Sequence, residues 1–536
     1  MRRNLLIAFA ALICISCSKQ KKENTEILLV PAGDKFTEIV PGGTTVLPSG
    51  RFLTPAGELI RITSDPFGMA LSPDYSKAVT LHNGVFTVID LASLHTSRIP
   101  DYEKKIASPF SNGSFLGVAF SKEPSVIYLS GGDNGAVIVY DIEKSERLDS
   151  ISLDGEFEGV KYEDSFTSDL AFNPDNNELL VLDRGNFRMV RLDMSSRKIT
   201  ASVKVGRQPF GLTLDPQRKL AFVANVGMYE YPVIKGATPE NYDTMLISHH
   251  PYGNNTPESI NGTVVEGREA PGVGDPLHPD AMSVFTIDLE TNAVMDKFKT
   301  GHQIGQMIED AEVVGGASPN SIAVGSRFAY VSNATNDNIS VIDYRNHKIT
   351  GHIPILVDRR IDRYRGLLPF GLTLSKDEKT LYVALLGFNA VAVIDTKTGK
   401  TKGLIPSGWG PVRVKLSAHE SEIYVITCRG LGAGPNGGSD FIAPVQGSFV
   451  SDIQLGSFQK IPVPDKNQLE YYTRQCIENT FVSQAMPEDT INPLPPLPGL
   501  RTSPIKHIIY ITKENRTYDE VLGQLRTGRG DSTLAR

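Results

Sequence analysis

The sequence predicts an all-β fold assembled from repeats, and three observations support that prediction. Residues 369–400 hold three short apolar runs separated by turn residues, a pattern typical of consecutive antiparallel strands. The same pattern recurs seven times along the chain. The 48 Gly and 34 Pro residues suit a chain with many tight turns. One such repeat cannot bury its own faces, so we expect the repeats to stack on one another.

The seven repeats align by their turn residues. Their first strands begin at Pro66, Leu116, Ser168, Pro209, Pro319, Pro369 and Pro411. Their third strands are predicted to end at Asp90, Asp141, Asp193, Asp288, Asp343, Asp395 and Asp452. An Asp at this place can accept hydrogen bonds from the backbone of the following turn, so we interpret the Asp positions as structural.

The spacing of these Asp residues predicts a seven-bladed β-propeller over residues 51–464. They lie 51, 52, 95, 55, 52 and 57 residues apart, and one four-stranded blade with its loops would fill each interval but the third. The ring closes if residues 57–62, GELIRI, supply the outer strand of the seventh blade. Residues 457–463, SFQKIPV, are the alternative outer strand.

The long third interval marks an insertion in the fourth blade, residues 228–279. A loop of this length inside a compact domain is usually functional or disordered. Its three histidines are candidate metal ligands: His249, His250 and His278. No Cys or carboxylate spacing completes a known ligand set, so a lid over one propeller face is the favoured interpretation.

Two positions in the first strands are candidate ligand-binding residues. Four repeats have Gly at the aligned position, whereas the third has Asp169 and the seventh has Arg413. Inner strands line the central channel of a propeller, so these charged side chains are expected to reach the channel. The seventh repeat also contains a Gly-rich stretch, residues 426–438, in which Arg429 and Asn436 are further candidates. Its backbone amides suit an anion or a partner loop, although an irregular connecting loop is the simpler interpretation.

The first 17 residues are predicted to be a signal peptide. Arg2 and Arg3 precede an apolar run that is too short to span a bilayer as a helix. Residues 15–17, Ile-Ser-Cys, resemble a bacterial lipobox, which implies that Cys17 is lipidated. A plain secretory signal cut elsewhere is the alternative. Residues 18–50 are expected to form a polar tether that leads into the propeller. The lipobox resemblance implies a lipoprotein of the cell envelope, exposed to the periplasm or the cell surface.

Composition narrows the classes of partner. The formal net charge of −7 and the pI near 5.9 give no electrostatic case for nucleic acid. A monomer is expected. Cys428 and Cys476 would remain after lipoprotein processing; they could pair, although nothing in the sequence requires a disulfide.

The repeats resemble a known family. The second strands FAYVSN and TLYVAL, with the turn before them and VID after, resemble the YVTN family of propeller repeats over about residues 66–463. The resemblance implies the fold and says little about function, because function depends on sites placed on a fold. The sequence shows no ring of carboxylates with calcium-type spacing and no aromatic platform, which disfavours a lactonase or quinone-dependent dehydrogenase.

The chain changes character after the propeller. Residues 465–482 predict a helix with a partial apolar stripe, and a Pro-rich stretch follows, so residues 465–504 are assigned as a helix and linker. Residues 505–512, IKHIIYIT, predict a strand buried on both faces. Residues 518–525, YDEVLGQL, predict the start of a helix. Polar residues between these two elements occupy the place where α/β folds carry their active sites.

This C-terminal stretch resembles the opening of a phosphoesterase family that includes bacterial phospholipases C and acid phosphatases, within the alkaline phosphatase superfamily. The resemblance implies that Glu514 and Asn515 are ligands of a catalytic divalent metal ion, which is expected only when the domain is complete. Only 24 residues follow Thr512, whereas such a domain needs roughly 150. No catalytic nucleophile is therefore expected within residues 505–536, and we expect a truncated or split form of the domain.

Two functions remain open. The first is a lipid-anchored extracytoplasmic propeller related to metal-dependent phosphoester hydrolases, with an incomplete catalytic domain. The second is a surface propeller that binds a ligand or a protein and has no enzymatic activity. The expected partners are the membrane, through the lipid, and an envelope protein or the missing phosphoesterase portion. The sequence leaves open whether the chain is an enzyme.

Overall fold

The computed structural model describes residues 26–533 except 101–112, 115, 216, 233, 239, 246–255, 309–310, 433–453, 486–492, 495–501, 513 and 528–529. The chain divides into two compact units. The larger is Val30–Val482, and the smaller combines the residues up to Leu29 with those from Ser483 onward.

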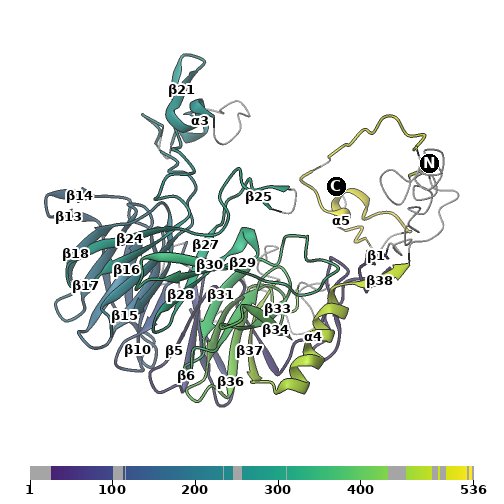
Figure 1. Ribbon diagram of the computed structural model, residues 1–536, viewed down its shortest axis with the longest axis horizontal. Coiled ribbons are helices and arrows are strands. Elements are labelled where there is room, and N and C mark those ends of the chain that lie inside the picture. Colours follow the sequence, from purple (N-terminus) through teal and green to yellow (C-terminus); the bar gives the residue numbers. More distant parts are fainter. Residues whose placement is uncertain are drawn as a thin grey trace, which may run out of the picture. The chain divides into compact units, whose positions relative to one another are not determined.

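Seven four-stranded antiparallel sheets build the larger unit (Figure 1). The first three are β5 (Gly68–Leu71), β6 (Lys77–His82), β7 (Val85–Asp90) and β8 (Thr96–Ile99); β9 (Val118–Phe120), β10 (Val126–Ser130), β11 (Ala136–Asp141) and β12 (Glu146–Ser152); and β15 (Thr167–Asn173), β16 (Glu178–Asp183), β17 (Arg188–Asp193) and β18 (Lys198–Lys204). The next three are β19 (Pro209–Asp215), β20 (Leu220–Asn225), β23 (Ser283–Asp288) and β24 (Ala293–Lys299); β27 (Pro319–Val324), β28 (Phe328–Asn333), β29 (Asn338–Asp343) and β30 (Lys348–Pro354); and β31 (Pro369–Leu374), β32 (Thr380–Leu385), β33 (Ala390–Asp395) and β34 (Lys400–Pro406).

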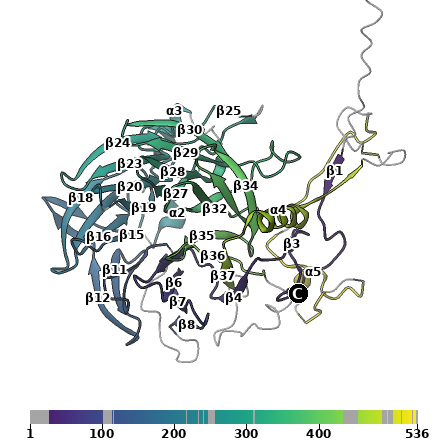
Figure 2. The ribbon, with the colours of Figure 1, turned by 60° about the horizontal axis from the view of Figure 1, so that its bottom comes forward.

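The seventh sheet closes the ring. It contains β35 (Pro411–Leu416), β36 (Glu422–Thr427) and β37 (Gly456–Pro462), and its outer strand is β4 (Glu58–Ile62) from the start of the unit. This settles the choice between two outer strands in favour of residues 57–62. Successive sheets pack through their first strands, and a shared cluster that includes Met69 and Val412 joins the seventh blade to the first (Figure 2). The fold is a seven-bladed β-propeller, as predicted.

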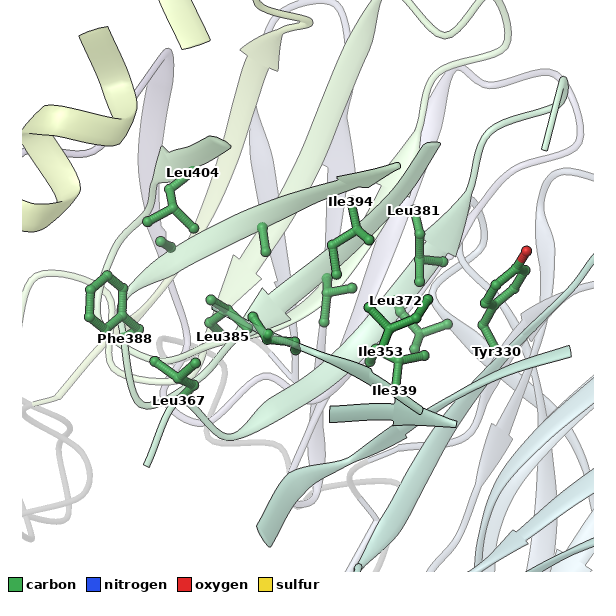
Figure 3. Close-up of a cluster of buried hydrophobic side chains, with 14 of the residues drawn as sticks. Tyr330, Ile339, Ile353, Leu367, Leu372, Leu381, Leu385, Phe388, Ile394 and Leu404 are labelled. Carbon is green, nitrogen blue, oxygen red and sulfur yellow. The ribbon is translucent and has the colours of Figure 1, made fainter. Parts of the chain in front are cut away.

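The core lies between adjacent blades. The second and third strands are the most apolar, and their side chains are buried on both faces because a blade stands on each side. Between the fifth and sixth blades, Ile339, Leu381 and Ile394 are fully buried (Figure 3). Burying one such side chain contributes about 1.5–3 kcal/mol, so these interfaces hold the blades together.

The predicted structural role of the Asp positions is confirmed for the turns that the structure describes. The Oδ1 atom of Asp395 accepts a hydrogen bond from the backbone N–H of Thr398 at 2.8 Å. These hydrogen bonds hold the pKa of the carboxyl group below its usual range, to about 2 at Asp395. The prediction for the seventh repeat is wrong, because its third strand is β37 and starts after Asp452. Asp452 itself lies outside the described residues.

The Gly positions of the first strands follow from close approach between blades. A Cβ atom on Gly211 would lie 2.2 Å from the carbonyl oxygen of Asn320 in the next blade. A Cβ on Gly371 would lie 2.3 Å from the carbonyl oxygen of Val412. Gly is therefore required where the backbone of the following blade comes this near.

The insertion leaves the fourth blade between β20 and β23, at the end of the blade where first strands begin (Figure 1). Its elements are α2 (Tyr242–Met245), α3 (Pro257–Asn261), β21 (Gly262–Val265) and β22 (Arg268–Pro271). Arg207 is 4% exposed and holds both ends of the insertion. Its guanidinium group donates to the carbonyl oxygens of Met228 at 2.9 Å and Asp275 at 2.8 Å, and pairs with Glu230 at 2.8 Å.

The predicted helix after the propeller is α4 (Lys466–Thr480), which Asp465 caps at its N-terminus. It packs against β34, the outer strand of the sixth blade. The apolar stripe of α4 is buried against this strand: Cys476 is 3% exposed, and Leu469 packs beside Gly403. Cys428 and Cys476 are both buried and both free, so they form no disulfide with each other.

Short elements complete the described residues. They are β1 (Glu26–Leu29), β2 (Thr45–Val46), β3 (Phe52–Leu53), β13 (Gly155–Phe157), β14 (Val160–Tyr162), β25 (Met307–Ile308), β26 (Ala311–Glu312), the 3-10 helix η1 (Ala334–Asn336), β38 (Val482–Ala485) and α5 (Tyr518–Leu522). No helix in the described part of the chain has the length and hydropathy needed to cross a membrane.

The smaller unit contains α5, where a helix is predicted, and Thr517 and Glu520 form its capping box. The predicted strand over residues 505–512 is wrong: these residues form no strand, and Ile509 is 86% exposed. A strand that is apolar on both faces needs neighbouring strands to pair with and layers to cover it. No described residue provides either.

Candidate functional site

The central channel of the propeller is the candidate functional site. Its walls are the seven first strands, β5, β9, β15, β19, β27, β31 and β35. At the end where these strands finish, the channel opens into a vestibule of about 720 Å³, within the range of small-molecule sites. The vestibule wall mixes apolar and charged side chains: Met69, Tyr75, Phe120, Phe172, Lys376 and Lys415.

A smaller polar cavity of about 120 Å³ continues the channel beyond the vestibule. Its polar lining comes from the third, fourth, fifth and seventh blades: Asp169, Thr213, Ser321, Arg413 and Lys415. The vestibule and this inner cavity share Met69, Val118 and Lys415, so the two spaces adjoin and Lys415 lies where they meet.

Aromatic side chains cross the channel at its opposite end, the end that carries the insertion. The ring of Phe370 lies 6.1 Å from that of Phe67 and 6.0 Å from that of Phe210, both in edge-on geometry. These residues belong to the sixth, first and fourth blades, so the contacts reach across the ring rather than between neighbours. The channel is therefore wide at one end and narrowed by aromatic rings at the other.

A local irregularity directs these side chains. The first strand of the fourth blade shifts register between Pro209 and Gly211, and that of the sixth blade between Pro369 and Leu372. Such β-bulges bend the strand and change the direction in which a side chain points. The repeated Pro-Phe-Gly sequence therefore provides a β-bulge, a Phe ring that points into the channel, and a Gly beside which the backbone of the next blade can pack closely.

Asp169 is buried in the channel wall, and both of its carboxylate oxygens have partners. Its Oδ2 atom accepts from the backbone N–H of Leu212 in the next blade, and its Oδ1 atom from that of Leu170, both at 2.9 Å. Burial raises the pKa of this carboxyl group, while Arg413 and the two N–H donors act in the opposite direction. Asp169 therefore joins the third blade to the fourth beside the inner cavity.

Arg413 reaches two other blades. Its Nε donates to the carbonyl oxygen of Phe67 in the first blade at 3.2 Å. Its Nη1 donates to the hydroxyl oxygen of Ser321 in the fifth blade, also at 3.2 Å. Burial lowers the pKa of the guanidinium group and Asp169 raises it, yet the group stays charged at any physiological pH. This residue fixes a positive charge at the floor of the channel.

Lys415 follows Arg413 by two residues on β35, so both side chains leave the strand on the same side. Its ammonium group makes no hydrogen bond or ion pair with any residue that the structure describes, and the side chain is exposed. Desolvation by the channel walls nevertheless lowers the pKa of its amine, as does repulsion from Arg413. The amine is held near a second cation without a carboxylate bound to it.

These residues suit binding better than catalysis. Asp169 uses its oxygens on backbone amides, so it is poorly placed to take a proton from a ligand. With Ser321, Arg413 and Lys415, the inner cavity offers directed donors on rigid strands. The arrangement can hold a polar group in one orientation.

The sequence predicted two of these four residues. Asp169 and Arg413 do reach the channel, and the structure brings them to the same inner cavity. Lys415 and the three Phe side chains were missed. The signal for Lys415 was available two positions after the aligned Gly, where the other six repeats have Ala or Thr.

The predicted sites near the seventh-blade loop lie elsewhere. Arg429 is exposed, and its guanidinium group lies 5.2 Å from the centre of the Trp409 ring. Asn436 and the rest of the Gly-rich stretch from residue 433 lie outside the described residues. Cys17, His249 and His250 also lie outside them.

The candidate metal ligands are not gathered into a site among the residues the structure describes. No group of three or more His, Cys, Asp or Glu side chains suitable for a metal ion occurs there. Glu514 and Asn515 are adjacent in sequence and both exposed. A hard divalent cation takes about six oxygen ligands. The pair does not fit such an ion without further ligands, so no chemical step is derived from it.

Comparison with known proteins finds structural similarity alone. No protein-family model matches the chain, and no curated protein matches it. Hydrazine synthase from Kuenenia stuttgartiensis is similar, with 14% identity, a TM-score of 0.45, and 68% of this chain and 92% of that chain covered. A streptogramin B lyase structure is similar at 10% identity and a TM-score of 0.45, with 75% and 97% covered.

Proposed function

We propose that this chain is an extracytoplasmic binding protein whose propeller receives a small ligand in its central channel. The observation that carries this proposal is the shape of the channel: a vestibule of about 720 Å³ leads to a polar inner cavity, and aromatic rings cross the far end. A ligand enters through the vestibule and is stopped by the charged floor. The YVTN-type repeats provide the scaffold in this account.

A ligand-observed NMR screen with saturation transfer tests the binding function. The purified chain is mixed with small anionic, neutral and cationic compounds, each carrying one aromatic ring. We expect at least one class to receive saturation and to lose it in Lys122→Trp, which places a bulky side chain at the exposed vestibule rim. Lys397→Trp, on an exposed turn of the sixth blade, is the matched control. Absence of saturation transfer for all classes overturns the function.

We further propose that the protein is held at the membrane by a lipid on Cys17. Its support is the sequence Ile-Ser-Cys after a short apolar run. Expression of the full chain in bacteria with labelled palmitate, followed by detergent partitioning, tests the anchor. We expect label in the wild type and in Cys14→Ser, and none in Cys17→Ser. Label that persists in Cys17→Ser contradicts the anchor.

The relation to phosphoester hydrolases is a second proposal, favoured by residues 505–519. Four consecutive apolar residues there, Ile508, Ile509, Tyr510 and Ile511, are each more than 80% exposed, and α5 follows them. Apolar side chains exposed to this extent suit burial against an apolar surface of a partner. A complementary phosphoesterase portion would cover this segment and supply the missing ligands beside Glu514 and Asn515.

A phosphatase assay tests this relation. We expect no hydrolysis of p-nitrophenyl phosphate by the chain alone. We expect hydrolysis by a protein extended through any following hydrolase reading frame, and loss of that activity in Glu514→Ala. An inactive extended protein, or an active one that tolerates Glu514→Ala, refutes the relation.

A further inference from the structure

We propose that the ligand of the channel is an organic anion, whose phosphate or carboxylate group is held in the inner cavity by Lys415 and Arg413. The remainder of the ligand, partly apolar, occupies the vestibule. This inference rests on the proposed binding function and specifies the chemical class of its ligand.

The charges of the inner cavity favour an anion. Two cationic side chains, Arg413 and Lys415, face one carboxylate, that of Asp169. Asp169 accepts from two backbone N–H groups and reaches no lysine or arginine in an ion pair among the described residues. The cavity lining therefore has an excess of positive charge; Arg413 is partly buried, whereas Lys415 is exposed, so solvent screens part of its attraction.

The donors that remain free favour an oxygen-bearing group. A guanidinium group has five N–H donors, and Arg413 makes two hydrogen bonds to the protein. The ammonium group of Lys415 has three donors and no partner among the residues described. Phosphate and carboxylate oxygens accept charge-assisted hydrogen bonds of this kind, about twice as strong as neutral ones.

The two volumes indicate the shape of the ligand. The inner cavity of about 120 Å³ has room for one charged group and some water, but not for a ring system with substituents. The vestibule is six times larger and is lined by Tyr75, Phe120 and Phe172 as well as by lysines. A ligand with a compact anionic head and a partly aromatic or aliphatic body matches both spaces.

The rim of the vestibule adds to the attraction. Lys376 and Lys122 line it together with Glu420, and the Lys376 ammonium group donates to the carbonyl oxygen of Ala418 at 2.6 Å. The two rim lysines lie outside the inner cavity, whereas Lys415 lines both spaces; all three are exposed, so salt screens their effect. We assign the rim lysines to the approach of the ligand and Lys415 to its retention.

Isothermal titration calorimetry with matched ligands tests the assignment. Phenyl phosphate and benzoate carry the anionic head, whereas benzyl alcohol and benzylamine have a similar body without it. Inorganic phosphate and acetate report the head alone. We expect an anionic aromatic compound to bind at least tenfold more tightly than the neutral or cationic one, and the ranking of phenyl phosphate against benzoate identifies the group.

Two variants test the residues. Lys415→Gln removes the charge and shortens the side chain by one atom, and we expect affinity for the anion to fall at least tenfold. Lys397→Gln, an exposed lysine on an outer turn, is expected to leave affinity within twofold. Arg413→Gln removes the second cation. If that variant does not fold, Arg413→Lys, which retains the charge, is used in its place. Each variant is checked by thermal unfolding before titration.

The outcomes separate the inference from the function. If neutral or cationic compounds bind as tightly as anions, or if Lys415→Gln binds anions as the wild type does, the anion assignment is wrong while the channel remains a binding site. If no compound of any class binds, the proposed function fails as well.

Discussion

Phe458 of β37 is the β-partner of Ile60 in β4, so the beginning and the end of the propeller sequence form one sheet. The pairing runs from Gly456 opposite Ile62 to Lys460 opposite Glu58. The last blade is thus completed by a strand from the start of the unit, which holds the two ends of the ring together. The ring depends on a strand that lies nearly four hundred residues away from its partner along the chain.

Removal of β4 is predicted to open the ring. A chain that starts at residue 63 loses the buried side chains of Leu47, Leu53 and Ile62 and the ladder on β37. We expect it to lose about 5 kcal/mol or more of unfolding free energy, from three apolar side chains alone. Urea unfolding followed by circular dichroism measures this. A chain that starts at Val30 is the control and should unfold like the full protein.

Gly211→Ala is predicted to destabilise the propeller without touching the apolar core. The new Cβ would lie 2.2 Å from the carbonyl oxygen of Asn320, and neither backbone can retreat without disturbing a blade. We expect a loss of about 1–3 kcal/mol, as for overpacked interiors. Gly351→Ala, on an outer strand where a Cβ meets nothing within 4 Å, should change stability by less than about 0.5 kcal/mol. Equal effects at both positions would refute the close-approach argument.

Acid should destabilise the protein between about pH 4 and pH 2. The pKa of Asp343 is lowered to about 2 by Arg327 and Asn346, and that of Asp395 to about 2 by the Thr398 N–H. Because the folded pKa lies below the unfolded value, these groups stabilise the fold above pH 4, and the gain is lost as pH falls through 2. We expect the melting temperature to fall over this window.

Asp395→Asn tests the assignment to the turns. The variant should be less stable than the wild type at pH 6 and should converge with it near pH 2, because the amide removes a titrating carboxylate. Thermal unfolding at several pH values gives the comparison. Glu266→Gln, on an exposed turn of the insertion, is the control. Parallel curves for Asp395→Asn and wild type would argue against this origin of the acid sensitivity.

Arg207→Gln is predicted to loosen the insertion and leave the ring intact. The guanidinium group binds the backbone of Met228 and Asp275, near the two ends of the insertion. Without it, limited proteolysis should cut within residues 228–279 at least several-fold faster. Glu266→Gln, on the exposed turn between β21 and β22, is the control. Cuts in the blades at the same rate as in the insertion would show that Arg207 supports the whole fold.

The repeats were predictable because each one carries its own turn residues. The Gly and Asp positions recur in the sequence for reasons that act within one blade or between neighbours, such as the approach of Asn320 to Gly211. The last strand of the seventh blade was harder, because Asp452 continues the spacing while the strand itself begins at Gly456. Pairing of β37 with β4 is a long-range contact that spacing alone does not specify.

The channel was predictable in part. Asp169 and Arg413 stand out because they replace Gly, but the meeting of Arg413 with Ser321 depends on the geometry of the closed ring. The Phe residues looked like part of a turn motif, and only their mutual distances of about 6 Å across the channel identify them as a cluster. Residues 505–512 were wrongly predicted to form a buried strand. An apolar run is buried only where neighbouring strands and layers are present to cover it, and here its side chains are exposed.

The most direct test of the central claim, that the channel of this propeller is an anion-binding site, is anomalous X-ray diffraction from crystals soaked in sodium selenate. Selenate has the charge and shape of a tetrahedral oxyanion, and selenium marks its position. We predict an anomalous peak in the inner cavity, within hydrogen-bond distance of Lys415 and Arg413, and its loss in crystals of Lys415→Gln. Selenate sites confined to the outer surface, or a channel peak that persists in Lys415→Gln, would contradict the claim.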